Sequence, residues 1–295
     1  MTSAEGVRAD VAVDVRADVG EGPHWDAQSM SLWFVDLTAG IVYRWDYTSR
    51  NLASFAVGHP VGAVIPRVAG GIALAVRDGI AAASESGGDF ELRCPIEVDN
   101  TQTRMNDAKC DPAGRMFAGT TAFDFAPGAA ALYRVDPDWS CEAVVRGVTT
   151  SNGTAWSPDG SRMYFIDSGQ RRVDVFDYDV TLGSASNRRQ LVSIDETAGV
   201  PDGMTVDAEG NLWVACFGGG AVRCYSPGGE PITLVELPVS QVTSCAFGGP
   251  DYGDLYVTSA RYQLSSAQLA EEPLAGATFV CRPGAIGRPA SRFAG

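Results

Sequence analysis

The chain has 295 residues, 45% of them hydrophobic, and a formal net charge of −14 at pH 7. An acidic surface repels phosphate backbones, so the composition disfavours a nucleic-acid partner. No run approaches 18 consecutive apolar residues, which excludes a transmembrane helix and leaves a globular chain with enough apolar residues for a substantial core.

Short strand-like segments, each preceded by a turn, recur along the whole chain. Six copies of one pattern can be found, namely DAQSMSLWFVD (26–36), RVAGGIALAV (67–76), DPAGRMFAGT (111–120), SPDGSRMYFID (157–167), DAEGNLWVAC (207–216) and PDYGDLYVTS (250–259). A separate early strand, DVAVDVR (10–16), comes before them. Aromatic and β-branched residues between Gly, Pro and Asp are typical of strands. Further strand-like segments come after these copies, for example at 41–46, 131–136, 172–179 and 221–227.

The spacing of the six copies predicts the fold class. The second residues of the central pairs are Trp33, Ala73, Phe117, Tyr164, Trp213 and Tyr256, separated by 40, 44, 47, 49 and 43 residues. A period in the forties with several strands per unit is typical of β-propeller blades. We therefore expect one all-β, six-bladed propeller domain over residues 1–295, ordered from about 14 to 285 with short terminal extensions. An eight-stranded sandwich would not explain six copies.

Ring closure is expected between the two ends of this region. The strand DVAVDVR should pair with the late segment ATFVCRP (277–283), which would remove the open edges of the sheets.

Polar residues occupy one offset in four of the copies. Glu21 and Asn152 lie 12 residues before the aromatic of their copies, and Asn106 and Asp202 lie 11 before theirs. The weak second copy has Gly62 or Ala63 there, and the sixth has Ser244 or Cys245. This position should precede the innermost strand of each blade. Because inner strands ring the central channel, we expect the four polar side chains to converge there.

These four side chains offer carboxylate and amide oxygens, which are ligands for a hard divalent cation. Adjacent glycines in GEGP, SNGT and PDGM would let the backbone bend and approach a bound group closely. The alternative is that Asn, Asp and Gly simply form turns, but glutamate is a poor turn residue. Only two histidines occur, His24 and His59, so a histidine-based zinc site or catalytic triad is poorly supplied.

Longer motifs resemble a known family. GEGPHW, RMNDAKCDPAGRMFAGT, TTSNGTAWSPDG, VPDGMTVDAEGNLWVACFGGG and TSCAFGGPDYGDLYVTSAR are similar to motifs of the SMP-30/gluconolactonase/LRE family. The resemblance runs from about residue 14 to the C-terminal region and is densest over 150–262. It implies a six-bladed propeller that hydrolyses sugar lactones to aldonic acids with a divalent metal ion.

The resemblance also implies roles for individual residues. Glu21, Asn152 and Asp202 would hold the metal, Arg104 and Asn106 would contact the substrate, and Asp124 is the nearest match to an acidic substrate-binding residue of the family. The chain is shorter than the family between Thr121 and Leu132. Calcium is the first expectation for the ion, with zinc, manganese or iron(II) as alternatives.

The expected reaction is ester hydrolysis, for which the ion would polarise the lactone carbonyl and activate water. Asp202 would also be the catalytic base, unless the ion itself activates the water sufficiently. Two alternatives remain open: an organophosphate hydrolase on the same propeller, and a non-catalytic calcium-binding regulatory protein. A protein-interaction propeller of the WD type is disfavoured by the polar central ring.

Seven cysteines at irregular spacings, with no C-x-x-C, are typical of free buried thiols in a reducing compartment. The N-terminus has no basic region followed by an apolar core. We therefore expect a cytoplasmic protein, monomeric or weakly homo-oligomeric, whose partner is a small-molecule sugar lactone and neither a membrane nor a nucleic acid.

Overall fold

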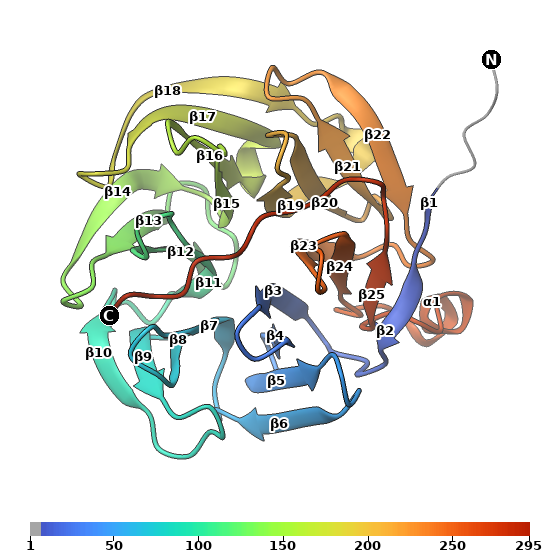
Figure 1. Ribbon diagram of the computed structural model, residues 1–295, viewed down its shortest axis with the longest axis horizontal. Helices are drawn as coiled ribbons and strands as arrows, with labels where there is room; N and C mark the ends of the chain where they lie inside the picture. Colours follow the sequence, from blue (N-terminus) through green and yellow to red (C-terminus); the bar gives the residue numbers. More distant parts are fainter. Residues whose placement is uncertain (1–6) are drawn as a thin grey trace.

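The computed structural model describes residues 7–295, and Figure 1 shows six small sheets arranged around a central channel. This confirms the predicted all-β, six-bladed propeller. Four blades comprise four sequential antiparallel strands each. The first blade has β3 (Gly20–Asp26), β4 (Ser31–Asp36), β5 (Ile41–Asp46) and β6 (Leu52–Ala56), and the second has β7 (Val61–Pro66), β8 (Ile72–Val76), β9 (Gly79–Ala83) and β10 (Glu91–Pro95). The third blade has β11 (Thr103–Cys110), β12 (Met116–Ala122), β13 (Ala130–Val135) and β14 (Cys141–Val148), and the fourth has β15 (Ser151–Trp156), β16 (Arg162–Asp167), β17 (Arg172–Asp179) and β18 (Ser184–Ser193).

The two remaining blades involve the N-terminal strands. The fifth blade comprises β19 (Val200–Val206), β20 (Leu212–Phe217), β21 (Ala221–Tyr225) and β22 (Pro231–Glu236), and β1 (Val7–Arg8) adds in parallel to its outer edge. The sixth comprises β23 (Val242–Gly248), β24 (Asp254–Ser259), β25 (Thr278–Cys281) and β2 (Asp10–Val13). Because β2 pairs antiparallel with β25, the predicted ring closure is confirmed.

Helical structure is sparse and lies outside the sheets. The short helices are η1 (Ser168–Gln170), η2 (Glu196–Ala198) and α1 (Ser266–Glu271), the last begun by a capping box between Ser265 and Gln268. No helix within residues 7–295 is long and apolar enough to cross a membrane. All seven cysteines are free, and six of them are buried.

The apolar core consists of six clusters, one between each pair of neighbouring blades. A blade in such a ring covers both faces of its sheet with neighbours, so its middle strands are apolar on both sides. Every residue of β4, SLWFVD, is accordingly buried. The central pair of each sequence repeat lies on the second strand of its blade. The repeat that was visible in the sequence is therefore the most buried strand of each sheet.

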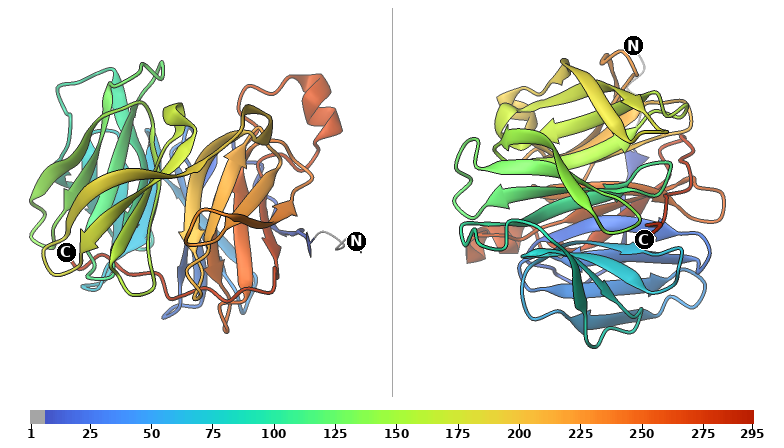
Figure 2. Two further views of the ribbon diagram at one scale, coloured as in Figure 1. Left: turned by 90° about the horizontal axis from the view of Figure 1, so that it is seen from above. Right: turned by 90° about the vertical axis from the view of Figure 1, so that its left-hand side faces the viewer.

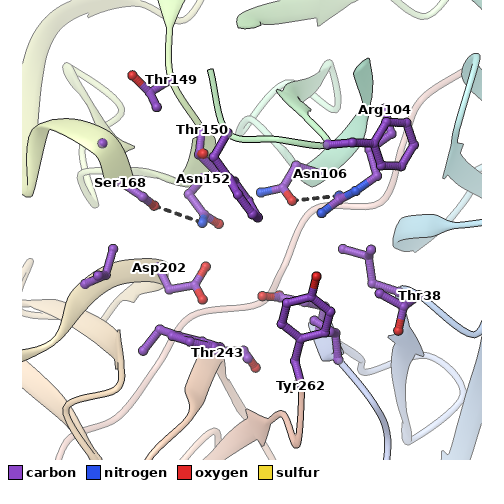
Figure 3. A pocket seen from close by; sticks show the side chains of 18 of the residues that line it. Thr38, Arg104, Asn106, Thr149, Thr150, Asn152, Ser168, Asp202, Thr243 and Tyr262 are labelled. Atoms are coloured by element: carbon purple, nitrogen blue, oxygen red, sulfur yellow. Dashed lines mark hydrogen bonds between the residues drawn. The ribbon is translucent and has the colours of Figure 1, made fainter. Parts of the chain in front are cut away.

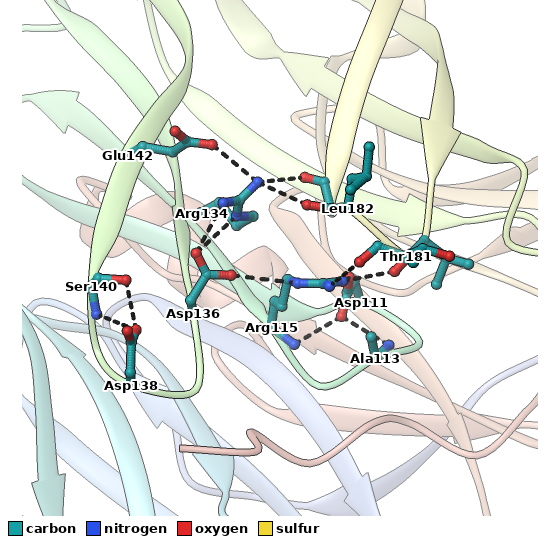
Figure 4. A network of polar contacts seen from close by, with 12 residues as sticks. Asp111, Ala113, Arg115, Arg134, Asp136, Asp138, Ser140, Glu142, Thr181 and Leu182 are labelled. Carbon is teal, nitrogen blue, oxygen red and sulfur yellow. Dashed lines mark hydrogen bonds and ion pairs between the residues drawn. The ribbon is translucent and has the colours of Figure 1, made fainter.

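Ion pairs reinforce the joint between the third and fourth blades (Figure 4). Arg115 bonds the buried Asp111 at 3.0 Å and donates to the carbonyls of Val180 and Thr181 at 2.8 and 2.7 Å. Arg134 bonds Asp136 at 2.9 Å and reaches the carbonyl of Gly183 at 3.0 Å. The turn after β17 is thus tied to the neighbouring blade.

The segment 282–295 crosses one face of the ring from β25 towards the second and third blades (Figure 1). In the side view of Figure 2 it runs along one face, whereas α1 rises from the opposite face. Phe293 is fully buried between blades two and three, and Arg292 forms a two-pronged ion pair with Asp26. We call this segment the C-terminal strap. It is an integrated part of the fold, whereas the sequence predicted a short terminal extension.

Candidate active site

The six inner strands (β3, β7, β11, β15, β19 and β23) share an irregularity at the same place. Each carries one extra residue relative to its partner strand, as in β15, where Ser151 pairs with Asp167 but Thr154 pairs with Phe165. A β-bulge of this kind redirects side chains locally. Asn106, Asn152 and Asp202 lie within these bulges, and Glu21 lies directly before one. The four polar residues therefore lie within their inner strands. We had predicted that they would precede these strands.

Carboxylates at the ends of two second strands fix where these inner strands begin. Asp36 accepts the backbone N–H groups of Asp18 and Val19 at 2.8 and 3.2 Å. Asp167 does the same for the N–H groups of Thr149 and Thr150, both at 3.2 Å. Each carboxylate thus anchors the chain just ahead of a residue that points into the channel.

The glycines beside the slot serve the packing of inner strands. Gly22 has a φ of +55°, in the left-handed region that favours glycine. Gly203 has no such φ, but a Cβ there would lie 2.0 Å from Oγ of Ser244 on the next inner strand. In the second blade, a Cβ on Gly62 would lie 2.0 Å from the carbonyl oxygen of Asn106. Close approach of neighbouring strands, which we had not predicted, therefore requires glycine at the last two positions.

A pocket of about 560 Å³ opens at the end of the channel where these bulges lie, and Figure 3 shows its polar side chains. It brings together five of the six predicted site residues: Glu21, Arg104, Asn106, Asn152 and Asp202. The structure does not bring Asp124 into this group. Asp124 is exposed on the loop after β12, and its Oδ1 accepts the backbone N–H of Ala126 at 3.1 Å.

A hydrogen-bond chain orients Asn152. Its Nδ2 donates to Oγ of Ser168 at 3.1 Å, and that hydroxyl donates to the carbonyl of Pro201 at 2.7 Å. This leaves Asn152 Oδ1 buried, with no hydrogen-bond partner within residues 7–295. A buried acceptor without a donor is costly, so this oxygen is suited to a bound cation.

Asn106 and Arg104 form a second unit, visible at the upper right of Figure 3. Asn106 Nδ2 donates to the carbonyl of Ser151 at 3.1 Å, while its Oδ1 accepts from the Arg104 guanidinium at 2.9 Å. The amide is thus engaged at both ends and holds the guanidinium toward the pocket. The structure thus places Asn106 between β15 and Arg104, and its predicted contact with the substrate stays a prediction.

Loss of hydration and mutual repulsion raise the pKa values of the buried carboxyls. Desolvation, then the charges of Asp202 and Asp107, raise the pKa of Glu21 well above its usual range. Desolvation and Asp107 do the same to the pKa of Asp202, and desolvation raises the pKa of Asp107 itself. Desolvation lowers the pKa of Arg104 to about 10. Among the described residues, the cationic side chains that act on these three carboxyls are Arg104 and Lys109, so a further positive charge would be stabilised here.

The donor set fits a hard divalent cation. Two buried carboxylates and an unpaired amide oxygen are the oxygen ligands that calcium and magnesium prefer. Within residues 7–295 no group of three or more His, Cys, Asp or Glu side chains is placed to hold a metal, so Asn152 is essential to any such site. The histidines lie elsewhere: buried His24, whose pKa desolvation lowers to about 4, lines a small cavity beneath the C-terminal strap.

Residues at or just after the ends of second strands also line the pocket, and we had not predicted them. They are Leu37 and Thr38, Phe123 and Phe125, Ser168 and Gly169, Phe217, and Tyr262. Counting forward from the central pair of each repeat, as we had counted backward, would have found them. In the sixth blade, the inner-strand residue that lines the pocket is Thr243, rather than Ser244 or Cys245.

Titration of the carboxyls should make the metal-free protein more stable in mild acid. The pKa values of Glu21 and Asp202 are raised in the folded state, so their protonated forms stabilise it. That contribution is complete below the ordinary carboxyl pKa of about 4 and is lost as pH rises through the raised values. Thermal unfolding with chelator present should therefore show a melting temperature that falls between mildly acidic and neutral pH. Glu21→Gln should flatten that fall, and an unchanged slope would contradict the assignment.

Comparisons with known proteins cover the whole ring. A family model described as SMP-30/Gluconolactonase/LRE-like region matches residues 19–261. Regucalcin from Danio rerio is 41% identical over 277 residues, which are 92% of this chain and 93% of that protein. The crystal structure of regucalcin from Agrobacterium tumefaciens, described as a calcium-binding protein, has a TM-score of 0.93 at 27% identity, covering 97% of both chains. A luciferin-regenerating enzyme has a TM-score of 0.90 at 33% identity, covering 97% of this chain and 99% of that one.

Proposed function

This chain belongs to the SMP-30/gluconolactonase/LRE-like family, and we propose that it is a metal-dependent hydrolase of lactones, with sugar lactones as the first substrate class. One observation carries the proposal. Glu21, Asp202 and the unpaired oxygen of Asn152 meet in one buried pocket, beside an arginine held toward the same space. A protein that only binds a cation needs the oxygen ligands alone. The oriented arginine and the space beside it would in addition accommodate a substrate, which favours an enzyme.

Glu21, Asn152 and Asp202 are the residues that would hold the cation. When bound there, a divalent cation would polarise an ester carbonyl and lower the pKa of a neighbouring water. We infer calcium as the first candidate, because all three ligands are oxygens and the similar Agrobacterium protein is described as calcium-binding. Zinc, manganese and iron(II) remain the alternatives to be compared with it.

The hydrolysis adds one water to the lactone. The water oxygen bonds to the carbonyl carbon, the ring C–O bond breaks, and the ring oxygen leaves as a hydroxyl. We assign removal of the water proton to Asp202, because its carboxylate lies in the same pocket as the other proposed ligands, and it can return this proton to the leaving ring oxygen. Arg104 would donate its remaining N–H groups to substrate oxygens.

We also propose a cytoplasmic location and a monomeric or weakly associating chain. The support is indirect: all seven cysteines are free, and the ring closes its sheet edges internally. The alternative that keeps the cation but not the chemistry is a calcium-binding protein, which the names of the relatives favour.

The proposal is tested by removing and restoring the metal. Chelator-treated protein should release no acid from D-glucono-δ-lactone above the spontaneous rate, and calcium, zinc or manganese should restore the release. Turnover that survives complete metal removal would contradict the mechanism. Stoichiometric metal binding without turnover on any lactone would instead favour the calcium-binding alternative. An organophosphate panel measured in parallel addresses the phosphotriester reaction.

A further inference from the structure

Two phenylalanines stand at the solvent end of the pocket. Phe123 and Phe125 are each 50% exposed, whereas the exposed fractions of Glu21, Asn152 and Asp202 are 6, 6 and 8%. All five line the same pocket. The polar groups therefore lie at its inner end and the aromatic pair at its mouth.

The backbone of Phe125 is unusual for so large a side chain. Its φ is +56°, a left-handed conformation that bulky residues rarely adopt. The hydrogen bond from its N–H to the carbonyl of Ala122 holds the turn, and the N–H of Phe123 is bonded to Gln102. The loop is thus fixed in a conformation that glycine would adopt more easily.

Packing does not account for Phe125. Trp139 and Tyr252 also have positive φ, but both pack on apolar clusters, and Trp139 meets Phe293 edge-on at 4.8 Å. Within residues 7–295, neither Phe123 nor Phe125 belongs to any of the six core clusters, and each is half exposed. An exposed, strained aromatic that stabilises no core suggests a role in binding.

Three threonine hydroxyls of the pocket already have hydrogen-bond partners. Thr38 already donates to Asp18, Thr150 shares a hydrogen bond with Thr121, and Thr243 donates to the carbonyl of Gly20. Apolar side chains complete the wall beside the phenylalanines: Leu37, Pro60, Val200 and Phe217. Hydroxyl groups of a substrate would thus find partners mainly at Arg104 and at the hydroxyl of Tyr262 beside it.

We propose that the preferred substrate is a lactone that carries an alkyl or aryl substituent on the ring carbon remote from the carbonyl. The carbonyl faces Asp202 and Arg104, and the substituent lies between Phe123 and Phe125. This inference rests on the proposed lactone hydrolysis and narrows its substrate class. Burial of the substituent against two aromatic rings supplies the preference.

A matched series of δ-lactones tests it on metal-loaded full-length protein, with δ-valerolactone as the bare ring, δ-decalactone as its alkylated form and D-glucono-δ-lactone as the polyhydroxylated form. For wild type, kcat/KM for δ-decalactone should exceed that for δ-valerolactone by about tenfold or more. The double variant Phe123→Ala/Phe125→Ala should lose this preference, so that its kcat/KM for δ-decalactone falls to about its value for δ-valerolactone. Ile232→Ala removes an equally exposed apolar side chain from β22 and should change neither value.

Phe125→Gly separates binding from folding. Glycine suits the left-handed φ, so the melting temperature should be kept or raised while the alkyl preference falls. If lactones are hydrolysed without an alkyl preference, or if the variants retain it, the inference is overturned and the proposed function stands. If no lactone is hydrolysed, the proposed function fails. Calorimetric titration with the alkyl δ-lactam 6-pentylpiperidin-2-one then decides the inference: binding that the double variant loses supports it, and absent binding overturns it.

Discussion

Replacing Asp202 by asparagine should leave the protein folded but lower kcat/KM for lactone hydrolysis by about a thousandfold. Asp202 is a proposed ligand of the cation and the proposed acceptor of the water proton. Asparagine keeps its size and an oxygen ligand, but it removes the negative charge and cannot accept the proton. The measurement is acid release from gluconolactone at saturating metal, with metal binding followed separately by calorimetry. Retention of more than about a tenth of the activity by metal-loaded protein would remove Asp202 from the chemistry.

The matched control is Asp124→Asn, the same change at the exposed carboxylate that the structure leaves outside the pocket. Its kcat/KM should stay close to wild type. An equally large loss at Asp124 would show that the loop after β12 moves over the substrate. Metal-free Asp202→Asn should also melt no lower than wild type at neutral pH, because it no longer buries a desolvated carboxylate.

The second large effect is expected on stability. Phe293→Ala should lower the free energy of unfolding by about 3–5 kcal/mol, the usual cost of emptying a buried aromatic site. Phe293 is fully buried against Trp139, and the strap's backbone on both sides of it bonds to the ring, as in the hydrogen bond from Ala294 to Gly114. Urea denaturation measures the loss.

Phe125→Ala is the control for that measurement, since a half-exposed phenylalanine outside the core clusters should change stability by no more than about 0.5 kcal/mol. The strap crosses the face away from the pocket, so kcat/KM of folded Phe293→Ala protein should stay near wild type. A small stability loss would mean that the strap lies on the ring without holding it together.

The strap also affects Asp26: burial would raise the pKa of this carboxyl, but hydrogen bonds from Ser29 and from Arg292 of the strap outweigh burial and lower the pKa.

The sequence was sufficient for the fold because the six blades repeat one buried strand. The aromatic of the central pair, such as Trp33 or Trp213, must fill the space between two blades, so its spacing reports the blade period directly. Counting back from it located Glu21, Asn106, Asn152 and Asp202 in one pocket. A fixed offset along an antiparallel pair of strands is a fixed position in space, which is why this step worked.

Features that depend on contacts between blades were not predictable in this way. The hairpin between β23 and β24 is longer than its counterparts, because Ala246 pairs with Tyr256 and Thr205 with Trp213, so the channel residue of the sixth blade is Thr243. A forward count from the repeat would locate Ser168, but not its hydrogen bond to Asn152, which forms only once η1 is packed beside β15. Phe293 lies far from any repeat, and only the packed ring reveals the site between two blades that buries it. Likewise, the turn that exposes Phe125 also directs Asp124 away from the pocket.

Ring closure has a consequence for how the chain must fold. The pairing of β2 with β25 joins Val11 to Phe279, residues at nearly opposite ends of the sequence. Contacts of such long range form slowly, because the intervening chain must first be brought together. During synthesis on a ribosome, β2 therefore stays unpaired until almost the whole chain has been made. Until then the edges of β2 and of the unfinished sixth sheet can pair with other chains. Chaperone demand and aggregation should thus concentrate in the interval before residue 281 emerges.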